Sequence, residues 1–281
     1  MAVGRVEAPN HPDQANGGLT RRYERATALA FVPSESEIAS IYDRIAEEFF
    51  HHRHDTTTDF DIVGWPWMRT ILNGRVNGKD VLDVACGTGV VSHKLFHDFE
   101  PESVQGVDIS GEMIRISRRE IRDKRARFSL QSASQMDFPD DSFDLAISTY
   151  GMDYIPDLSS ALREIRRVLR PGGSFVFLVP HPNRNQLYYE GGGGEGPFSE
   201  GWYVETWPGA GGVEIPKHYL KLGTWIRELD LSGFNFKRMH EPHPLQPAME
   251  AAPEIYQRYM RGPRTVIFDA VTEGARATAL S

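Results

Sequence analysis

Two glycines and an acidic residue have types and a spacing that suit the binding of a polar ligand. Gly87 and Gly89 lie in a turn between a short apolar run, Val81–Ala85, and a segment of helical periodicity. Glycine lacks a Cβ atom, so backbone can approach a ligand closely there, and free N–H groups at a helix start favour polar or anionic groups. Asp108 ends the next apolar run, nineteen residues after Gly89. An acid at this distance can accept hydrogen bonds from both ribose hydroxyls of a nucleoside.

An ordinary strand, turn and helix with a solvent-facing acid is the alternative interpretation. The strand context, the spacing and a second acid, Asp83, favour the nucleoside site. A nicotinamide cofactor would require a third glycine three residues after Gly89, where Ser92 stands, so a dehydrogenase is not indicated. Cys86 has no paired base and is interpreted as a small packing residue rather than a nucleophile.

Short apolar runs alternate with helical segments from Asp80 onward, a pattern typical of a parallel sheet with crossover helices. The pattern predicts strands near Val81–Ala85, Ser103–Val107, Arg127–Gln131, Leu145–Ser148, Ser174–Val179, Phe234–Met239 and Thr265–Val271. It predicts helices near Gly89–Phe99, Gly111–Asp123, Ser159–Leu169 and His218–Leu231.

The segments before and within this pattern define the expected domains. Residues 1–17 are polar and rich in glycine and proline, so we expect disorder there. A helix over Leu19–Phe31 and an amphipathic helix that starts at Ser34 predict a helical cap over residues 18–75. Residues 76–281 are predicted to form the α/β domain, with a loop-rich, aromatic lid inserted at 183–217.

Composition limits the partners and the compartment. The chain has 281 residues and a net charge of -8, which disfavours nucleic acid and anionic membranes as partners. A single cysteine excludes an internal disulfide, and no apolar run approaches the roughly 20 residues that span a bilayer. These features predict a cytoplasmic protein, and no metal site is indicated.

Six stretches of the chain, taken in order, resemble the class I S-adenosylmethionine-dependent methyltransferases of the ubiquinone/menaquinone-methyltransferase type. They are Val81–Gly89, Gly106–Met113, Ser134–Pro139, Ser142–Asp144, Tyr154–Asp157 and Glu164–Gly173. The resemblance covers about residues 36–180. It implies an α/β, Rossmann-like sheet of seven mostly parallel strands, with helices on both faces and the last strand antiparallel. It also implies S-adenosylmethionine as cofactor and a small-molecule acceptor.

The resemblance implies contacts to each part of that cofactor. Asp83 and the turn after it would hold the methionine end, Asp108 the ribose, and Thr149 with Tyr150 would lie beside the sulfonium. Core filling is the alternative for Met113 and Met136. The implied cofactor residues are Tyr42, Asp83, Ala85, Cys86, Gly87, Thr88, Gly89, Asp108, Ile109, Met113, Ser134, Gln135, Met136, Thr149 and Tyr150.

Three ionisable residues are candidate catalytic groups for the acceptor. Asp153 follows the fourth strand, where relatives often carry a histidine, His181 ends the fifth strand, and His218 begins the helix after the insertion. The alternatives are a capping role for Asp153, a turn for His181 and packing for His218. Aromatic side chains are the candidates for binding the acceptor: Tyr23, Trp65, Trp67, Tyr188, Trp202 and Tyr203.

This supply of rings is similar to that of terpenoid and indole C-methyltransferases of secondary metabolism, since ring faces stabilise a cation that develops on carbon. Methylation of oxygen or nitrogen is the first alternative, and a non-catalytic cofactor-binding scaffold is the second. The helix over Leu19–Phe31 has an apolar face that must be buried, which predicts a homo-oligomer joined through it.

Overall fold

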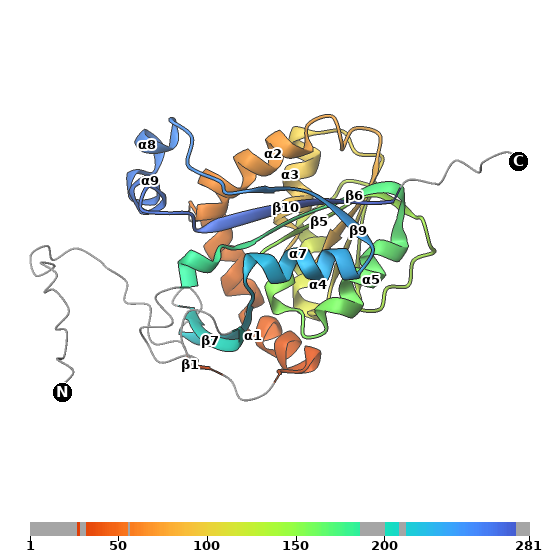
Figure 1. Cartoon of the computed structure of the whole chain (residues 1–281), viewed down its shortest axis with the longest axis horizontal. Coiled ribbons are helices and arrows are strands. Elements are labelled where there is room, and N and C mark those ends of the chain that lie inside the picture. The colour runs from red at the N-terminus through yellow and green to blue at the C-terminus, as the bar shows by residue number, and fades with distance from the viewer. Residues whose placement is uncertain (1–26, 29–31, 56, 186–199, 208–211, 274–281) are drawn as a thin grey trace, which may run out of the picture.

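Seven strands form one mixed sheet in the middle of the protein (Figure 1). The computed structural model describes residues 27–28, 32–55, 57–185, 200–207 and 212–273. The order across the sheet is β4-β3-β2-β5-β6-β10-β9; β10 is antiparallel to both of its neighbours, and the pairs from β4 to β6 are parallel. The fold class predicted from the sequence is therefore confirmed. The bounds are β2 (Asp80–Val84), β3 (Ser103–Asp108), β4 (Ala126–Leu130), β5 (Phe143–Thr149), β6 (Leu169–Pro180), β9 (Phe234–His240) and β10 (Thr265–Thr272).

Helices bury both faces of this sheet. On one face, α2 (Trp65–Leu72) and α3 (Val90–Asp98) pack with the short turn η1 (Phe60–Gly64) against strand residues such as Ile147 and Val176. On the other face, α5 (Leu158–Val168) and α7 (Leu222–Leu231) cover aromatic strand residues (Figure 1). The alternation of β-branched and aromatic residues along the strands makes both faces apolar, as a sheet covered on two sides requires. The remaining crossover helix, α4 (Gly111–Glu120), packs on β3 and β4.

A β-hairpin corrects the prediction for the insertion. Residues 183–217 were expected to be loop-rich, but β7 (Gly201–Trp207) pairs antiparallel with β8 (Val213–Tyr219) along its whole length. His218 lies in β8, so the predicted helix start at this residue is also wrong, and α7 begins at Leu222. Tyrosine, tryptophan and valine favour strands, and Trp202, Tyr203 and Val204 follow one another in β7.

The N-terminal segment also differs from the prediction. Thr27–Ala28 form a short strand, β1, which pairs with Val204 and Tyr203 of β7, so the helix predicted over Leu19–Phe31 is wrong at these two residues. The other residues of that range, and residues 1–17, lie outside the described residues. Since β1 joins a sheet of its own chain, the homo-oligomer inferred from this helix loses its structural argument.

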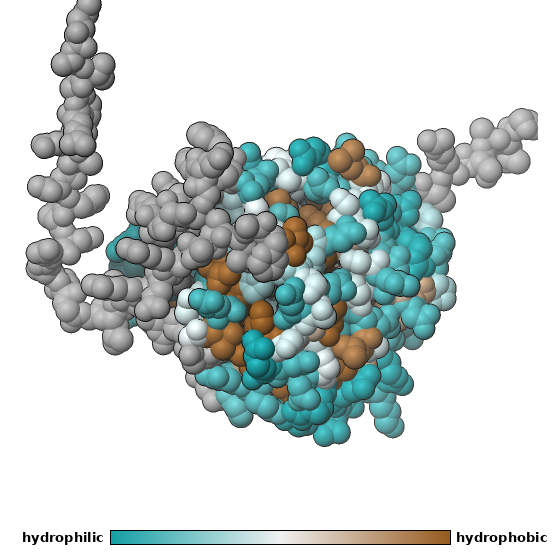
Figure 2. Space-filling model, turned by 90° about the horizontal axis from the view of Figure 1, so that it is seen from below, coloured by the Kyte–Doolittle hydropathy of each residue, from teal (hydrophilic) through white to brown (hydrophobic). Residues whose placement is uncertain are grey.

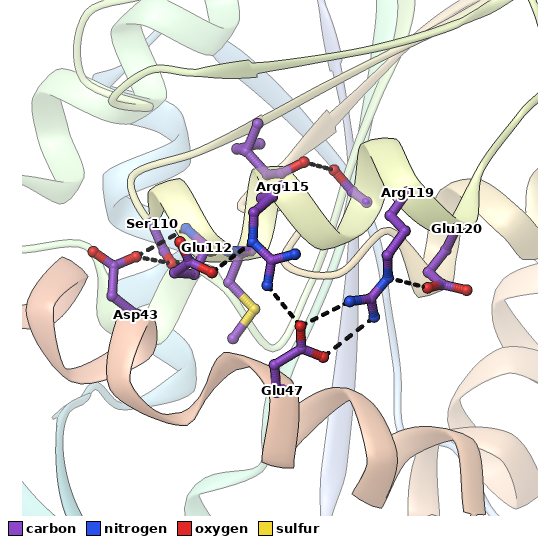
Figure 3. Close-up of polar contacts among 10 residues, drawn as sticks. Asp43, Glu47, Ser110, Glu112, Arg115, Arg119 and Glu120 are labelled. Carbon is purple, nitrogen blue, oxygen red and sulfur yellow. Dashed lines mark hydrogen bonds and ion pairs between the residues drawn. The ribbon is translucent and has the colours of Figure 1, made fainter.

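The second predicted N-terminal helix is present as α1 (Glu35–Asp55), which docks on α4 through polar side chains (Figure 3). Asp43 Oδ1 accepts a hydrogen bond of 2.6 Å from the Ser110 hydroxyl. Glu47 accepts hydrogen bonds from Arg115 and Arg119, at 2.6 Å and 2.7 Å. These arginine hydrogen bonds lower the pKa of Glu47 to about 2. The contacts fix α1 over the ends of β2 and β3, and apolar residues of both helices pack between them.

Within the ranges that the structure describes, no helix has the length and apolar character needed to cross a membrane. The same ranges contain no group of three or more histidine, cysteine or acidic residues that could hold a metal ion.

Candidate active site

A cavity of about 1310 Å³ opens where β2, β3 and β5 end. The glycine turn after β2, the acid at the end of β3 and the residues after β5 all contribute to its wall. Parallel strands bring their carboxyl ends to one edge of the sheet, and such an edge is where open α/β sheets bind ligands. We call this part of the wall the strand-end half of the cavity; α1 covers it with Ile38 and Tyr42.

The backbone of the strand-end half takes conformations that leave room for a ligand. Ala85, Gly87 and Tyr150 all have positive φ, at 53°, 54° and 53°, and such strain in residues other than glycine concentrates at functional sites. A Cβ atom added at Gly87 would meet nothing within 4 Å, so the space beside its backbone is open. The neighbouring Thr88 hydroxyl is buried without a hydrogen-bond partner among the described residues. We call this turn the cradle, because it leaves open space for a ligand beside a hydroxyl group that has no partner among the described residues.

Asp108 is held in place by the backbone. Its Oδ2 accepts a hydrogen bond from the Gly87 N–H at 2.8 Å, and its Oδ1 accepts one from the Ser110 N–H at 2.9 Å. Burial raises the pKa of Asp108, and these backbone donors oppose the rise. Each carboxylate oxygen retains a lone pair. The side chain lines the cavity and can accept two further hydrogen bonds there.

Asp83 is the second acid of the strand-end half. Its side chain is buried, and Oδ2 accepts a hydrogen bond of 2.6 Å from the Ser92 hydroxyl. Burial, with a smaller contribution from the charge of Asp108, raises the pKa of Asp83 to about 7. The Asp83 carboxyl group therefore gains and loses its proton as the pH passes through neutrality.

The other half of the cavity, which we call the aromatic half, has rings from four elements and from the residue after β5 on its wall. They are Phe49, Phe60, Tyr150, Tyr154 and Trp207. The rings contact one another, with centroids 5.1 Å apart for Phe49 and Trp207 and 6.3 Å apart for Phe60 and Tyr150. On the face that carries α1 and the hairpin, hydrophobic residues gather in the middle and hydrophilic residues surround them (Figure 2).

Charged side chains stand beside these rings. Lys217 and Glu205, on neighbouring strands of the hairpin, form an ion pair of 2.5 Å, and Arg184 lies 3.9 Å from the same carboxylate. Burial is the largest single influence and lowers the pKa of Lys217, but Glu205, Tyr203 and Asp153 together outweigh it and raise the pKa of the ammonium above its ordinary value. The sequence analysis did not select Glu205 and Lys217, because the pairing of β7 with β8 brings them together.

Most of the residues implied to bind the cofactor lie on the cavity wall. They are Tyr42, Asp83, Ala85, Cys86, Gly87, Thr88, Asp108, Ile109, Met113, Thr149 and Tyr150. Gly89 instead caps α3 in the left-handed conformation. The residues after β4 are corrected: Gln131 and Ala133 line the cavity, whereas Ser134, Gln135 and Met136 do not. The chain turns at Ser132, and Met136 is buried in the hydrophobic core.

The three candidate catalytic residues do not line the cavity. Asp153 is buried, burial raises its pKa, and its Oδ1 has no hydrogen-bond partner among the described residues. His181 lies with Nε2 3.0 Å from Glu241, and its Nδ1 accepts a hydrogen bond from the Asn183 N–H. His218 stacks on Trp202 with centroids 5.0 Å apart, and burial lowers its pKa.

The aromatic candidates for acceptor binding that the structure describes do not line the cavity either. The Trp65 indole donates to Asp98 at 2.6 Å, and the Trp67 indole donates to the His243 carbonyl at 2.8 Å. Trp202 and Tyr203 are buried in β7 away from the cavity wall. A buried indole N–H needs an acceptor, and that need sets the orientation of Trp65 and Trp67. Tyr23 and Tyr188 lie outside the described residues.

The sheet order, the cradle at Gly87 and the acid at Asp108 define a domain that binds a nucleoside-containing cofactor. Comparison with known proteins agrees: the family described as a methyltransferase domain matches residues 81–173. A ubiquinone/menaquinone biosynthesis C-methyltransferase of Hahella chejuensis is 31% identical over 153 residues, which are 51% of this chain and 59% of the relative. A demethylmenaquinone methyltransferase of Listeria welshimeri is 30% identical over 155 residues, 53% of this chain and 65% of the relative. These matches span less than two thirds of either relative's length.

Solved structures extend the likeness to most of the chain. An S-adenosylmethionine-dependent methyltransferase from Mesorhizobium loti has a TM-score of 0.60 at 25% identity, covering 74% of this chain and 96% of its own. The cyclase SpnF has a TM-score of 0.60 at 17% identity, covers 89% of this chain and all of its own, and shows the fold alone. Residues 81–173 form a class I S-adenosylmethionine-dependent methyltransferase domain, and S-adenosylmethionine is its methyl donor. The family and cofactor implied by the motifs are confirmed.

Cofactor affinity should rise as the pH increases toward 7. Asp83 has a pKa of about 7 without the cofactor, and a cofactor ammonium held beside it would lower this pKa, so binding would release a proton. Below pH 7 each unit of acidification should weaken binding by up to about tenfold, and above pH 7 the affinity should level off. Calorimetry in two buffers of different ionisation enthalpy measures both quantities. Asp83→Asn is the control that should lose the pH dependence; an affinity independent of pH in the unaltered protein would contradict the assignment.

Proposed function

We propose that the protein transfers the methyl group of S-adenosylmethionine to a carbon atom of a small unsaturated or aromatic molecule. The observation that carries the proposal is the continuity of the cavity: one wall runs from the cradle at Gly87 to the rings at Tyr154 and Trp207. A cofactor in the strand-end half and an acceptor in the aromatic half would then share one space.

The residues of the chain fit that cofactor. The Gly87 backbone leaves space for the methionine end, the unpartnered Thr88 hydroxyl can bind a polar group, and Asp108 can accept hydrogen bonds from ribose hydroxyls. When bound, S-adenosylmethionine supplies an electrophilic methyl group. The protein's contribution is orientation and exclusion of water, since both raise the rate of a displacement that needs two aligned reactants.

Two elements outside the central sheet provide this enclosure. α1 lies along the cavity with Ile38, Tyr42 and Phe49 on its wall, and the hairpin adds Trp207 and Ile215. Tyr42 packs edge-on against Tyr154 with centroids 5.4 Å apart, and their phenol groups are buried. Burial raises the pKa of both phenols well above the ordinary value, so they stay neutral and do not supply a base.

The rings support methylation at carbon. An alkene or aromatic carbon that accepts a methyl cation acquires positive charge, and ring faces within about 6 Å stabilise such a charge. The name of the Hahella relative, a C-methyltransferase, agrees with this chemistry. Methylation of oxygen or nitrogen is the second candidate, because Glu205 and Lys217 place polar groups on the same wall, where they can bind a hydroxyl or an amine.

A labelled methyl group tests the proposal. The protein is incubated with S-adenosylmethionine that carries a ¹³C methyl group and with a panel of small unsaturated and aromatic metabolites; we expect S-adenosylhomocysteine and a product with ¹³C bonded to carbon. Trp207→Ala should lower turnover without changing cofactor affinity, because Trp207 belongs to the aromatic half. Label on oxygen or nitrogen would favour the second candidate. Tight cofactor binding with no methylated product from any acceptor would favour a non-catalytic scaffold.

A further inference from the structure

Charge divides the cavity into two unlike halves. The strand-end half has acids on its described wall, namely Glu35, Asp83 and Asp108, and no lysine or arginine. The aromatic half has five cationic side chains against three acids, although the whole chain carries a net charge of -8. The cations are Arg53, Arg184, Lys217, Arg258 and Arg261, and the acids are Asp59, Glu205 and Glu254. The excess of cations favours an anion in the aromatic half.

Arg53 is a cation with much unused hydrogen-bonding capacity. Its guanidinium lies 5.0 Å from the centroid of the Phe60 ring, and its hydrogen bond to the Thr58 hydroxyl, the only one that it forms with a described residue, is long at 3.4 Å. Among the side chains that the structure describes, no carboxylate lies within ion-pair distance of the Arg53 guanidinium. Asp61, on the neighbouring segment, pairs with Lys94 instead. A guanidinium has five N–H donors in a planar fork that matches carboxylate and phosphate oxygens. Arg53 can therefore bind an anion without breaking an ion pair.

Arg258 stands on the same part of the wall. It belongs to α9 (Pro253–Tyr259), and its Nη2 pairs with Asp59, the residue next to Phe60 in the chain; all three line the cavity. Its Nε is buried and has no hydrogen-bond partner among the described residues. Arg261, two residues after α9 ends, is exposed and also lines the cavity. A second guanidinium therefore lines the cavity together with Arg53.

We propose that the methyl acceptor carries an anionic group, a carboxylate or a phosphate, and that Arg53 and Arg258 bind it. The inference rests on the proposed function, since it places the acceptor in the aromatic half. The anionic group would lie against Arg53, Phe60 and α9, and the unsaturated part of the acceptor would extend among the rings toward the cofactor. A positively charged acceptor is disfavoured by the same wall.

Calorimetric titration of the protein saturated with S-adenosylhomocysteine tests the proposal. The probes are inorganic pyrophosphate, benzoate and the neutral analogue benzamide, at low ionic strength. We expect one of the two anions to bind at least tenfold more tightly than benzamide, and the tighter anion identifies the group as phosphate or carboxylate. Arg53→Gln and Arg258→Gln should each weaken that binding at least tenfold. Arg227→Gln is the matched control, because Arg227 is exposed and pairs with Glu228 outside the cavity.

The cofactor itself separates the possible failures. S-adenosylhomocysteine should bind both cavity variants as it binds the unaltered protein; an equal loss of its affinity in Arg53→Gln would mean that Arg53 serves the cofactor carboxylate, and would overturn the proposal. Unaltered protein that binds the cofactor product and neither anion would also overturn it. Failure to bind the cofactor product would refute the proposed function and this inference together. Melting temperatures show whether Arg53→Gln is folded, and Arg258→Gln provides the second, more exposed variant.

Discussion

Gly87→Val should abolish binding of S-adenosylmethionine and leave a folded protein. Gly87 has a φ of 54°, a region that costs an L-residue roughly 1–2 kcal/mol and a β-branched residue more. The Cβ atom of the new side chain would meet no protein atom within 4 Å, since the space beside Gly87 is open, and the side chain would fill volume that the cofactor needs. The loss of affinity should exceed a hundredfold by calorimetry, with a melting temperature lowered by a few degrees.

Gly74→Val is the matched control for the strain. Gly74 also has a positive φ, 77°, with nothing within 4 Å of an added Cβ, but it lies in an exposed turn outside the cavity. It should show a similar fall in melting temperature and ordinary cofactor affinity. Equal affinity in the two variants would remove Gly87 from the cofactor site.

Asp108→Ala should have the second largest effect, weakening cofactor binding by roughly 1.5–3 kcal/mol, or about ten- to 150-fold, as expected for hydrogen bonds to a charged group. The substitution removes the acceptor for the ribose hydroxyls and releases the Gly87 N–H, which is now held at 2.8 Å. The substitution would thus remove the ribose acceptor and, at the same time, loosen the backbone of the cradle at Gly87. Cofactor titration measures the loss.

Asp230→Ala, which removes an exposed acid from α7 outside the cavity, should leave affinity unchanged. An unaltered affinity in folded Asp108→Ala protein would show that the ribose is bound by other groups.

The central sheet could be predicted from the sequence because its signals are local. Each strand is a short apolar run, and the predicted run Ser103–Val107 differs from β3 by one residue. The glycine turn and Asp108 belong to strands that are neighbours in both sequence and space, so their spacing indicates their contact. The strand-end half of the cavity was therefore accessible to sequence reasoning.

The aromatic half depends on contacts between distant segments. Thr27 pairs with Val204, and no local periodicity indicates that a segment of helical pattern will find a strand 177 residues away. Trp65 was selected for its ring, but its indole N–H is bound to Asp98 on α3, which turns the ring into the core. Aromatic content indicated that rings would be available, whereas the tertiary fold decided which of them line the cavity.

α1 touches both halves of the cavity, and this links the two ligands thermodynamically. The helix begins at Glu35, which lines the strand-end half and accepts a hydrogen bond from Ser132, and it carries Arg53 near its other end. A helix of 21 residues moves largely as one body, so a cofactor that fixes its first turns also restricts its last. Cofactor and acceptor should then strengthen each other's binding by the same factor, as reciprocity of binding free energies requires.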